Sequence, residues 1–184
     1  MIGAARGGFA KVVYSLLRFG VRIDGRDSAG SSALHHAVKR KQEEVVRVLL
    51  QQGADANAAN AGGTTPLMLA CLLRGDQGPA IVSLLLSAEC SMEATDKEGW
   101  TALGHATTHG RYATVEALVK AGAQLNSRNH HGSTPLMLAC RNGQQAVAEL
   151  LVAHKAEVDM QDNQGTSCLM TAAIFGDRAH LGGT

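Results

Sequence analysis

One phrase recurs along the chain at a nearly constant interval and limits what the chain can fold into. Each copy centres on a leucine that follows a threonine or serine and then a proline or another small residue. The intervals between successive leucines are 33, 36, 33 and 33 residues, and the leucines are Leu34, Leu67, Leu103, Leu136 and Leu169. A period near 33 residues is typical of a solenoid, in which similar supersecondary units stack side by side.

A second apolar phrase follows each of the first four leucines, as in Val45–Leu50 and Ile81–Leu86. Apolar residues at i, i+3 and i+4 predict an amphipathic helix. Gly53 and Gly122 close two of these phrases, because glycine adopts the left-handed conformation that ends a helix. Turn signals such as Asp27–Gly30 come next. Each unit is therefore predicted to be helix, turn, helix and β-turn finger.

The combined pattern, D-x-x-G-x-T-P-L-x-x-A followed by V-x-x-L-L-x-x-G-A-x-x-N, resembles the ankyrin repeat. Its threonine can cap the first helix, and its proline is tolerated in the first turn. The resemblance covers nearly the whole chain and implies an all-α solenoid of stacked helix-turn-helix units with β-turn fingers. Neither end carries the polar outer face expected of a terminal unit, so we expect a fragment of a larger natural protein.

The repeat boundaries follow from the same pattern. We expect one domain over residues 1–184, made of a partial repeat 1–25, repeats 26–58, 59–94, 95–127 and 128–160, and a partial repeat 161–184. The repeat 59–94 holds three extra residues, which we place in a loop at 74–80. Glu89–Cys90 replaces the usual Gly-Ala, and Gly104 stands where the family usually has histidine, so a less regular helix end and finger are expected there.

Charge is distributed unevenly along the chain. The first fifty residues hold nine basic and four acidic residues, whereas the remainder holds eight basic and twelve acidic ones. This gradient, and a single basic run at Lys39–Lys41 without interleaved aromatic residues, argue against nucleic-acid binding. No apolar stretch approaches the ~20 residues that cross a bilayer. We therefore expect a protein partner, no nucleic acid and no membrane insertion.

The sequence suggests no chemistry of its own. The cysteines Cys71, Cys90, Cys140 and Cys168 are widely spread, which favours a reducing cytoplasmic or nuclear setting and structural thiols. The histidines form no H-E-x-x-H or triad motif, and we expect His35 to bond to the neighbouring finger instead. We predict that the chain is not an enzyme and has no catalytic, cofactor or metal site.

In the ankyrin family, partners usually lie along the fingers and inner helices, and this places the candidate binding residues. They are Trp100, Leu69, Leu72, Leu73, Lys97, Glu98, His109, Lys39, Arg40, His130, His131, Arg141, Asn142 and Phe175. Tryptophan is enriched among residues that dominate binding energy, although Trp100 could also be a local packing anchor. We predict a groove with an apolar middle and a basic end near Lys39, suited to a peptide with hydrophobic anchors and acidic residues.

The function expected from the resemblance is that of a scaffold or adaptor that binds a peptide or domain of another protein, as a monomer. One alternative is a structural or regulatory segment within a larger enzyme, channel or receptor. Another, compatible with binding, is that the chain is a modification target. Asn57 and Asn126 match the asparagine that family members can present for hydroxylation, with Leu49 and Leu118 eight residues upstream.

Overall fold

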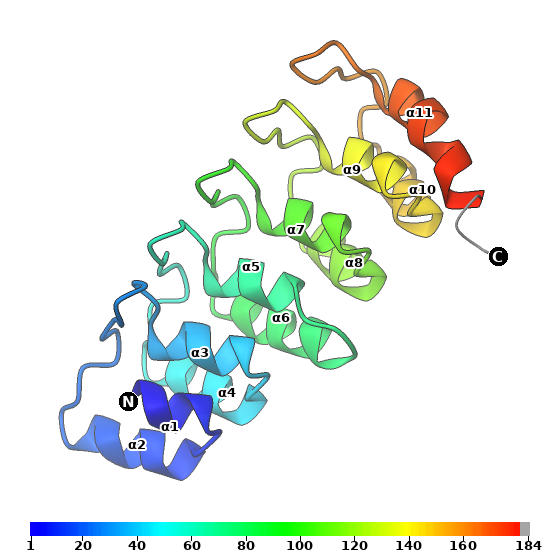
Figure 1. The fold of residues 1–184 in the computed structure, drawn as a ribbon. Coiled ribbons are helices and arrows are strands. Elements are labelled where there is room, and N and C mark those ends of the chain that lie inside the picture. Colours follow the sequence, from blue (N-terminus) through cyan, green and yellow to red (C-terminus); the bar gives the residue numbers. More distant parts are fainter. Residues whose placement is uncertain (181–184) are drawn as a thin grey trace. The chain divides into compact units, whose positions relative to one another are not determined.

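The computed structural model describes the backbone of residues 1–180 and the side chains of residues 1–174. The chain forms two compact units, Met1–Lys97 and Glu98–Thr184. Figure 1 shows that short helices joined by extended loops build both of them. An isolated bridge between Gln161 and Ser167 is the β-structure of the described residues. The prediction of an all-α fold is confirmed.

The first unit consists of two layers of stacked helices. In one layer α1 contacts α3 and α3 contacts α5, and in the other α2 contacts α4 and α4 contacts α6. The helices are α1 (Ile2–Arg6), α2 (Ala10–Arg18), α3 (Ala33–Lys39), α4 (Glu43–Gln51), α5 (Pro66–Cys71) and α6 (Gln77–Ser87). We call the α1, α3, α5 layer the inner helices and the other layer the outer helices.

The second unit repeats this arrangement. The inner helices α7, α9 and α11 contact one another in order, and the outer helices α8 and α10 pack side by side. Their bounds are α7 (Ala102–Thr108), α8 (Tyr112–Lys120), α9 (Pro135–Arg141), α10 (Gln145–Ala153) and α11 (Cys168–His180).

The inner helices begin where the sequence predicts. The Thr65 hydroxyl accepts a hydrogen bond from the amide of Met68 at 3.3 Å, and Thr134 accepts one from Met137 at the same distance. Proline occupies the start of both α5 and α9, where an amide would have no helical partner. A threonine followed by a proline thus determines where each of these two helices begins.

The recurring leucines form the core, with one exception. Leu34, Leu67, Leu103 and Leu136 are each at most 2% exposed, whereas Leu169 in α11 is 77% exposed. The first four are covered by an outer helix and by neighbouring inner helices. No outer helix follows α11 within residues 168–180, so the same position remains open.

Each finger is held by a side chain that mimics a backbone turn. One carboxylate oxygen of Asp27 accepts hydrogen bonds from the amides of Ala29 and Ser31, both at 2.9 Å. Asn60, Asn129 and Asp162 make the same two bonds at the equivalent position of their own repeats. Neighbouring fingers within a unit are joined by one backbone bond, such as the 3.0 Å bond from Asn163 N to His131 O.

Two expected irregularities are resolved differently from the prediction. The insertion at 74–80 is not entirely a loop, because Gln77–Ala80 are helical and extend α6 to 11 residues, against nine in each of α4, α8 and α10. The end of α6 is regular, because Glu89 takes the left-handed conformation (φ 53°) that Gly53 and Gly122 take at the same place.

Glycine is required at one finger tip for two reasons: its φ is positive, and the backbone of the next finger lies very close to it. Gly132 has φ 76°, and an added Cβ would lie 2.8 Å from the amide nitrogen of Asn163 in the next finger. Gly165 has nearly the same φ, 77°, but a Cβ there would meet nothing within 4 Å. A side chain at Gly165 would meet only the conformational strain, whereas one at Gly132 would also collide with the next finger.

We predict that Gly132→Ala lowers the free energy of unfolding by more than Gly165→Ala does. The left-handed conformation costs a non-glycine residue about 1 kcal/mol at either site. Gly132→Ala should cost roughly 1 kcal/mol more, because it also displaces the neighbouring finger. Urea denaturation of both variants measures the difference, and equal losses would contradict the role assigned to finger contact.

His35 links its helix to the next finger, as predicted. Its Nε2 lies 3.0 Å from the backbone oxygen of Thr64, and its Nδ1 lies 2.9 Å from the Ser32 hydroxyl. The side chain is 1% exposed, and burial lowers the pKa of His35 below its ordinary value of 6.5. The imidazole is therefore neutral in the native state at neutral pH.

Because the folded-state pKa of His35 lies below that of the unfolded chain, the unfolded state binds the extra proton first as pH falls. Stability from this group is complete above pH ~6.5 and declines below it. We expect the urea midpoint to fall between neutral pH and about pH 5. His35→Gln should flatten that dependence, and an unchanged pH profile in the variant would rule out His35 as its source.

Candidate functional site

In the first unit, several predicted binding residues lie together. Lys39 and Arg40 are exposed at the end of α3, while Leu69, Leu72 and Leu73 are partly exposed in α5 and just after it. Helices α3 and α5 are neighbours, and the Lys41 ammonium donates a hydrogen bond to the backbone oxygen of Arg74 at 2.9 Å. The basic pair and the leucines thus share one edge of this unit.

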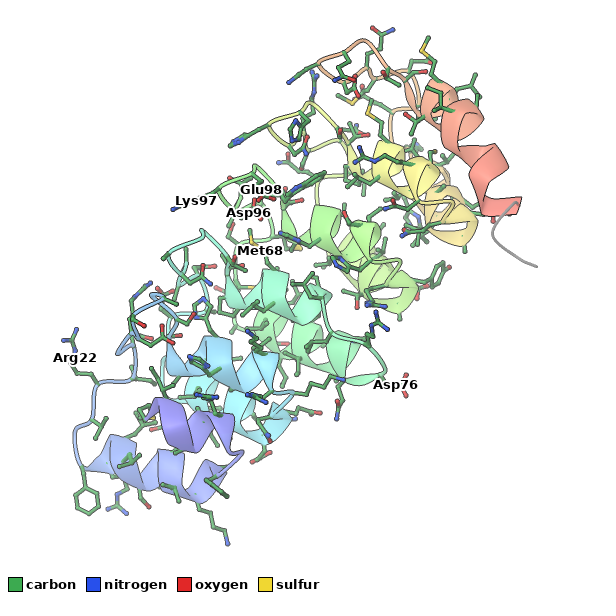
Figure 2. The ribbon with its side chains drawn as sticks, in the orientation of Figure 1. Arg22, Met68, Asp76, Asp96, Lys97 and Glu98 are labelled. Carbon is green, nitrogen blue, oxygen red and sulfur yellow. The ribbon has the colours of Figure 1, made fainter. Side chains whose placement is uncertain are left out.

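Lys97 ends the first unit in the finger that precedes α7. Its side chain is exposed and extends away from the ribbon (Figure 2), while its amide donates to the backbone oxygen of Gly62 at 3.2 Å. The backbone is therefore fixed by the neighbouring finger and the side chain is left for solvent or a partner.

Trp100 is partly buried and packs locally. An added Cβ on Gly104 would lie 2.8 Å from Cε3 of the indole, so the ring covers this glycine. The replacement of histidine by Gly104 is thereby explained, since a side chain there would collide with the tryptophan. Trp100 belongs to the second unit and the three leucines to the first, so the groove joining them stays a prediction.

The other predicted residues of the second unit are exposed: Glu98, His109, His130, His131, Arg141 and Asn142. Two are held by neighbouring backbone, because the Asn142 amide donates to the oxygen of Thr108 at 3.2 Å and His109 Nδ1 lies 3.0 Å from the oxygen of His105. Phe175 lies outside the residues whose side chains are described.

A concavity of the second unit lies between its last two fingers and helices α9 and α11. It consists of two adjoining hollows, of about 270 and 230 Å³, which share the side chains of Ser133, Arg141, Asp162 and Gln164. The remaining lining residues are His131, Asn163, Met137, Thr166, Thr171 and Ile174. We refer to this concavity as the Arg141 groove.

Opposite charges border the Arg141 groove. Backbone hydrogen bonds from Thr166 and Gln164 hold the pKa of Asp162 below its ordinary value, and the charge of Arg141 adds to them. The carboxylate therefore stays ionised at neutral pH while it holds its finger. The exposed guanidinium of Arg141 offers planar donors to a carboxylate or an amide of a bound chain.

The family pattern predicts most of the groove lining but not all of it. Finger-tip positions, where partners are expected, include His131, Ser133, Asn163, Gln164 and Thr166, and inner-helix ends include Arg141 and Ile174. The pattern gives Asp162 only as a turn residue and Met137 only as part of a helical phrase, and it does not single out Thr171. The signal that could have found Met137 is its place one helical turn before Arg141, which puts both on one side of α9.

No group of three or more His, Cys, Asp or Glu side chains among the described residues could hold a metal ion. Burial raises the pKa of the Cys71 and Cys90 thiols, the latter to about 11, so neither is a ready nucleophile. Across the described part of the chain, each helix is too short or too polar to span a bilayer.

The two asparagines considered for hydroxylation both bridge consecutive repeats. The side-chain oxygen of Asn57 accepts from the amide of Ser91 at 2.7 Å, and that of Asn126 accepts from Glu157 at 3.0 Å. Asp24 plays the same part toward Asp55 at 3.1 Å. A carboxylate oxygen and an amide oxygen thus accept the same bond, so the contact between repeats depends on the position of the residue in its repeat and not on the amide group.

Comparison with known proteins matches this architecture. A family model described as "Ankyrin repeats (3 copies)" matches residues 1–78, 58–129, 76–162 and 126–181. Relatives include a glycerophosphocholine phosphodiesterase gde1 of Schizosaccharomyces pombe, 33% identical over 56% of this chain and 9% of that protein. The human SH3 and multiple ankyrin repeat domains protein 2 is 29% identical over 59% of the chain and 6% of its own length.

A channel subunit is also similar: human transient receptor potential cation channel subfamily A member 1 is 34% identical over 62% of this chain. The aligned region is 10% of that protein. The chain thus spans a tenth or less of the length of these three relatives.

Proposed function

This chain belongs to the ankyrin-repeat family, whose repeats are protein–protein interaction modules, and on that premise we propose that it binds a peptide or domain of a partner protein along its fingers and inner helices. In this role it acts as a scaffold or adaptor. The exposed side chains at finger tips and inner-helix ends supply the contacts, because the fold does not need them for its core.

The observation that carries the proposal is the Arg141 groove. It combines a guanidinium and several hydrogen-bonding side chains with the apolar side chains of Met137 and Ile174. An extended peptide can place an acidic or amide side chain toward Arg141 and an apolar side chain toward Ile174, which is 60% exposed. Asp162 is already ionised beside Arg141, so it offsets part of the charge that a partner would meet. The partner must therefore form well-placed hydrogen bonds with the guanidinium as well as carry the opposite charge.

The edge formed by Lys39, Arg40, Leu69, Leu72 and Leu73 is proposed as a second contact region, in the first unit. Its cations suit acidic residues of the partner, and its leucines suit an apolar anchor. Trp100, which is partly exposed, is proposed to contribute from the second unit.

We expect Arg141→Glu with Ile174→Ser to abolish retention of partner proteins in an affinity capture from cell extract. Trp100→Ala with Leu73→Ser should also weaken it. Tyr112→Ser is the matched control, because Tyr112 is an exposed aromatic residue (44%) on outer helix α8. Partners are identified by mass spectrometry and titrated as purified proteins.

Circular dichroism and melting temperature must stay close to wild type, above all for Trp100→Ala, since the indole also packs on Gly104. If a folded Arg141→Glu/Ile174→Ser variant bound the purified partners as tightly as Tyr112→Ser does, the groove would not be the binding surface.

The alternative role, a structural or regulatory ankyrin segment of a larger enzyme, channel or receptor, is favoured by the relatives. Their names include a phosphodiesterase and a cation channel subunit. In this role the same surfaces would bind other parts of the protein's own polypeptide. The sequence of the full gene distinguishes the two.

Hydroxylation of Asn57 and Asn126 is proposed as a further property. Coexpression with an asparaginyl hydroxylase should add the mass of one oxygen atom per site, and we expect Asn57, whose side chain is more exposed, to react to the greater extent. Intact mass and peptide mapping measure this, with Asn57→Ala as the control. An unmodified chain in the presence of active enzyme would refute it.

A further inference from the structure

Two cysteines of the second unit lie where consecutive inner helices meet. Cys140 is near the end of α9 and Cys168 is the first residue of α11, and these two helices pack side by side (Figure 1). Cys140 and Ala172 line one small hollow, and Cys168 lies one helical turn before Ala172 on the same side of α11. The packing of α9 against α11 therefore brings together two thiols that are far apart in the sequence.

Hydrogen bonds connect the two sulfur atoms to each other and to the backbone. The side chains of Cys140 and Cys168 hydrogen-bond to each other, and the Cys168 thiol donates to the backbone oxygen of Val158 at 2.9 Å. Both are free thiols and both are partly exposed, whereas Cys71 and Cys90 are buried. Cys140 and Cys168 are thus in contact with each other and accessible to a small molecule.

The repeat does not require cysteine at either position. Cys168 occupies the position where α5 and α9 begin with proline, and Cys140 occupies the position of Thr107 in the preceding repeat. In the earlier repeats the same two positions hold Val38 and Pro66, Cys71 and Ala102, and Thr107 and Pro135. Among the described repeats the thiol pair is therefore particular to the contact between α9 and α11.

We propose that Cys140 and Cys168 form a reversible disulfide when the protein meets a peroxide, and that this bond fastens α9 to α11. The same two helices contribute Met137, Arg141 and Ile174 to the Arg141 groove. Oxidation therefore fixes the two helices that line the groove to each other, and reduction releases them.

The chemistry balances with hydrogen peroxide as the oxidant. The Cys168 thiolate attacks one peroxide oxygen, the O–O bond breaks, and the released hydroxide takes the thiol proton, which leaves a sulfenic acid and one water. The Cys140 sulfur then attacks the sulfenic sulfur, the S–S bond forms, and the departing hydroxide leaves with the Cys140 proton as a second water. Two thiols are oxidised and one peroxide is reduced.

The surroundings of Cys140 suit it to the second of these steps. Burial raises the pKa of the Cys140 thiol, and the neighbouring Cys168 raises it further. A thiol with a raised pKa reacts slowly with an oxidant in solution, because little of it is thiolate. Its attack on a sulfur atom held beside it is favoured by proximity instead.

The test treats the purified, reduced chain with a small excess of hydrogen peroxide and maps its peptides without reduction. We expect the intact mass to fall by that of two hydrogen atoms, and the peptides that contain Cys140 and Cys168 to be joined. The oxidised chain should melt roughly 5 °C above the reduced one, since the link closes a loop in the unfolded chain. Dithiothreitol should restore the mass and the melting temperature.

Cys140→Ser and Cys168→Ser should each prevent the link and the gain in melting temperature, and the remaining thiol should gain oxygen atoms instead. Cys90→Ser, which removes a buried thiol of the first unit, is the matched control and should form the link as the wild type does. Peptide mapping of the wild type gives an answer even where a variant does not fold. The proposal is overturned if Cys140 and Cys168 stay unlinked, or if they pair with Cys71, Cys90 or a second molecule.

Discussion

A pair of helices as short as those of one repeat cannot bury its own apolar face, and this constraint governs the whole structure. Leu136 is 2% exposed because α10 and the adjacent inner helices cover it, whereas Leu169, at the same position of its repeat, is 77% exposed. The leucine is identical in both cases and only its neighbours differ. Stability in such an array resides in the interfaces between repeats as much as in the repeats themselves.

The stacking of the repeats does not use every surface position, and we propose that the remaining positions bind a partner. Within the second unit, Asp162 both holds its finger turn and borders the Arg141 groove. The finger scaffold and the candidate site therefore share a side chain.

The sequence predicted features that depend on contacts repeated in every unit. Thr65, Pro66 and His35 behave as expected because a cap, a first-turn proline and a finger contact are each set by a few neighbouring residues. The prediction of a loop at Gln77–Ala80 was wrong. Glycine and proline usually mark a loop, but a proline is tolerated within the first turn of a helix, and these residues begin α6.

The Arg141 groove could be predicted only in part. His131 and Arg141 lie at positions where the family places its binding residues, but the depth of the groove depends on how α9, α11 and two fingers pack. Likewise the cover that Trp100 provides for Gly104 is a matter of ring orientation, which the residue spacing permits but does not require. Such features depend on how side chains pack in three dimensions, which the spacing of residues in the sequence does not specify.

The bonds between adjacent fingers have a mechanical consequence. Asn163 N donates to His131 O at 3.0 Å, the Asn163 side-chain amide donates to the backbone oxygen of His130 at 2.8 Å, and the Arg128 guanidinium donates to that of Gln161 at 3.0 Å. The last two fingers are therefore fastened to each other at several points, independently of the helices below them. A tilt of one of these loops has to move its neighbour as well, so the pair responds to a load as one body.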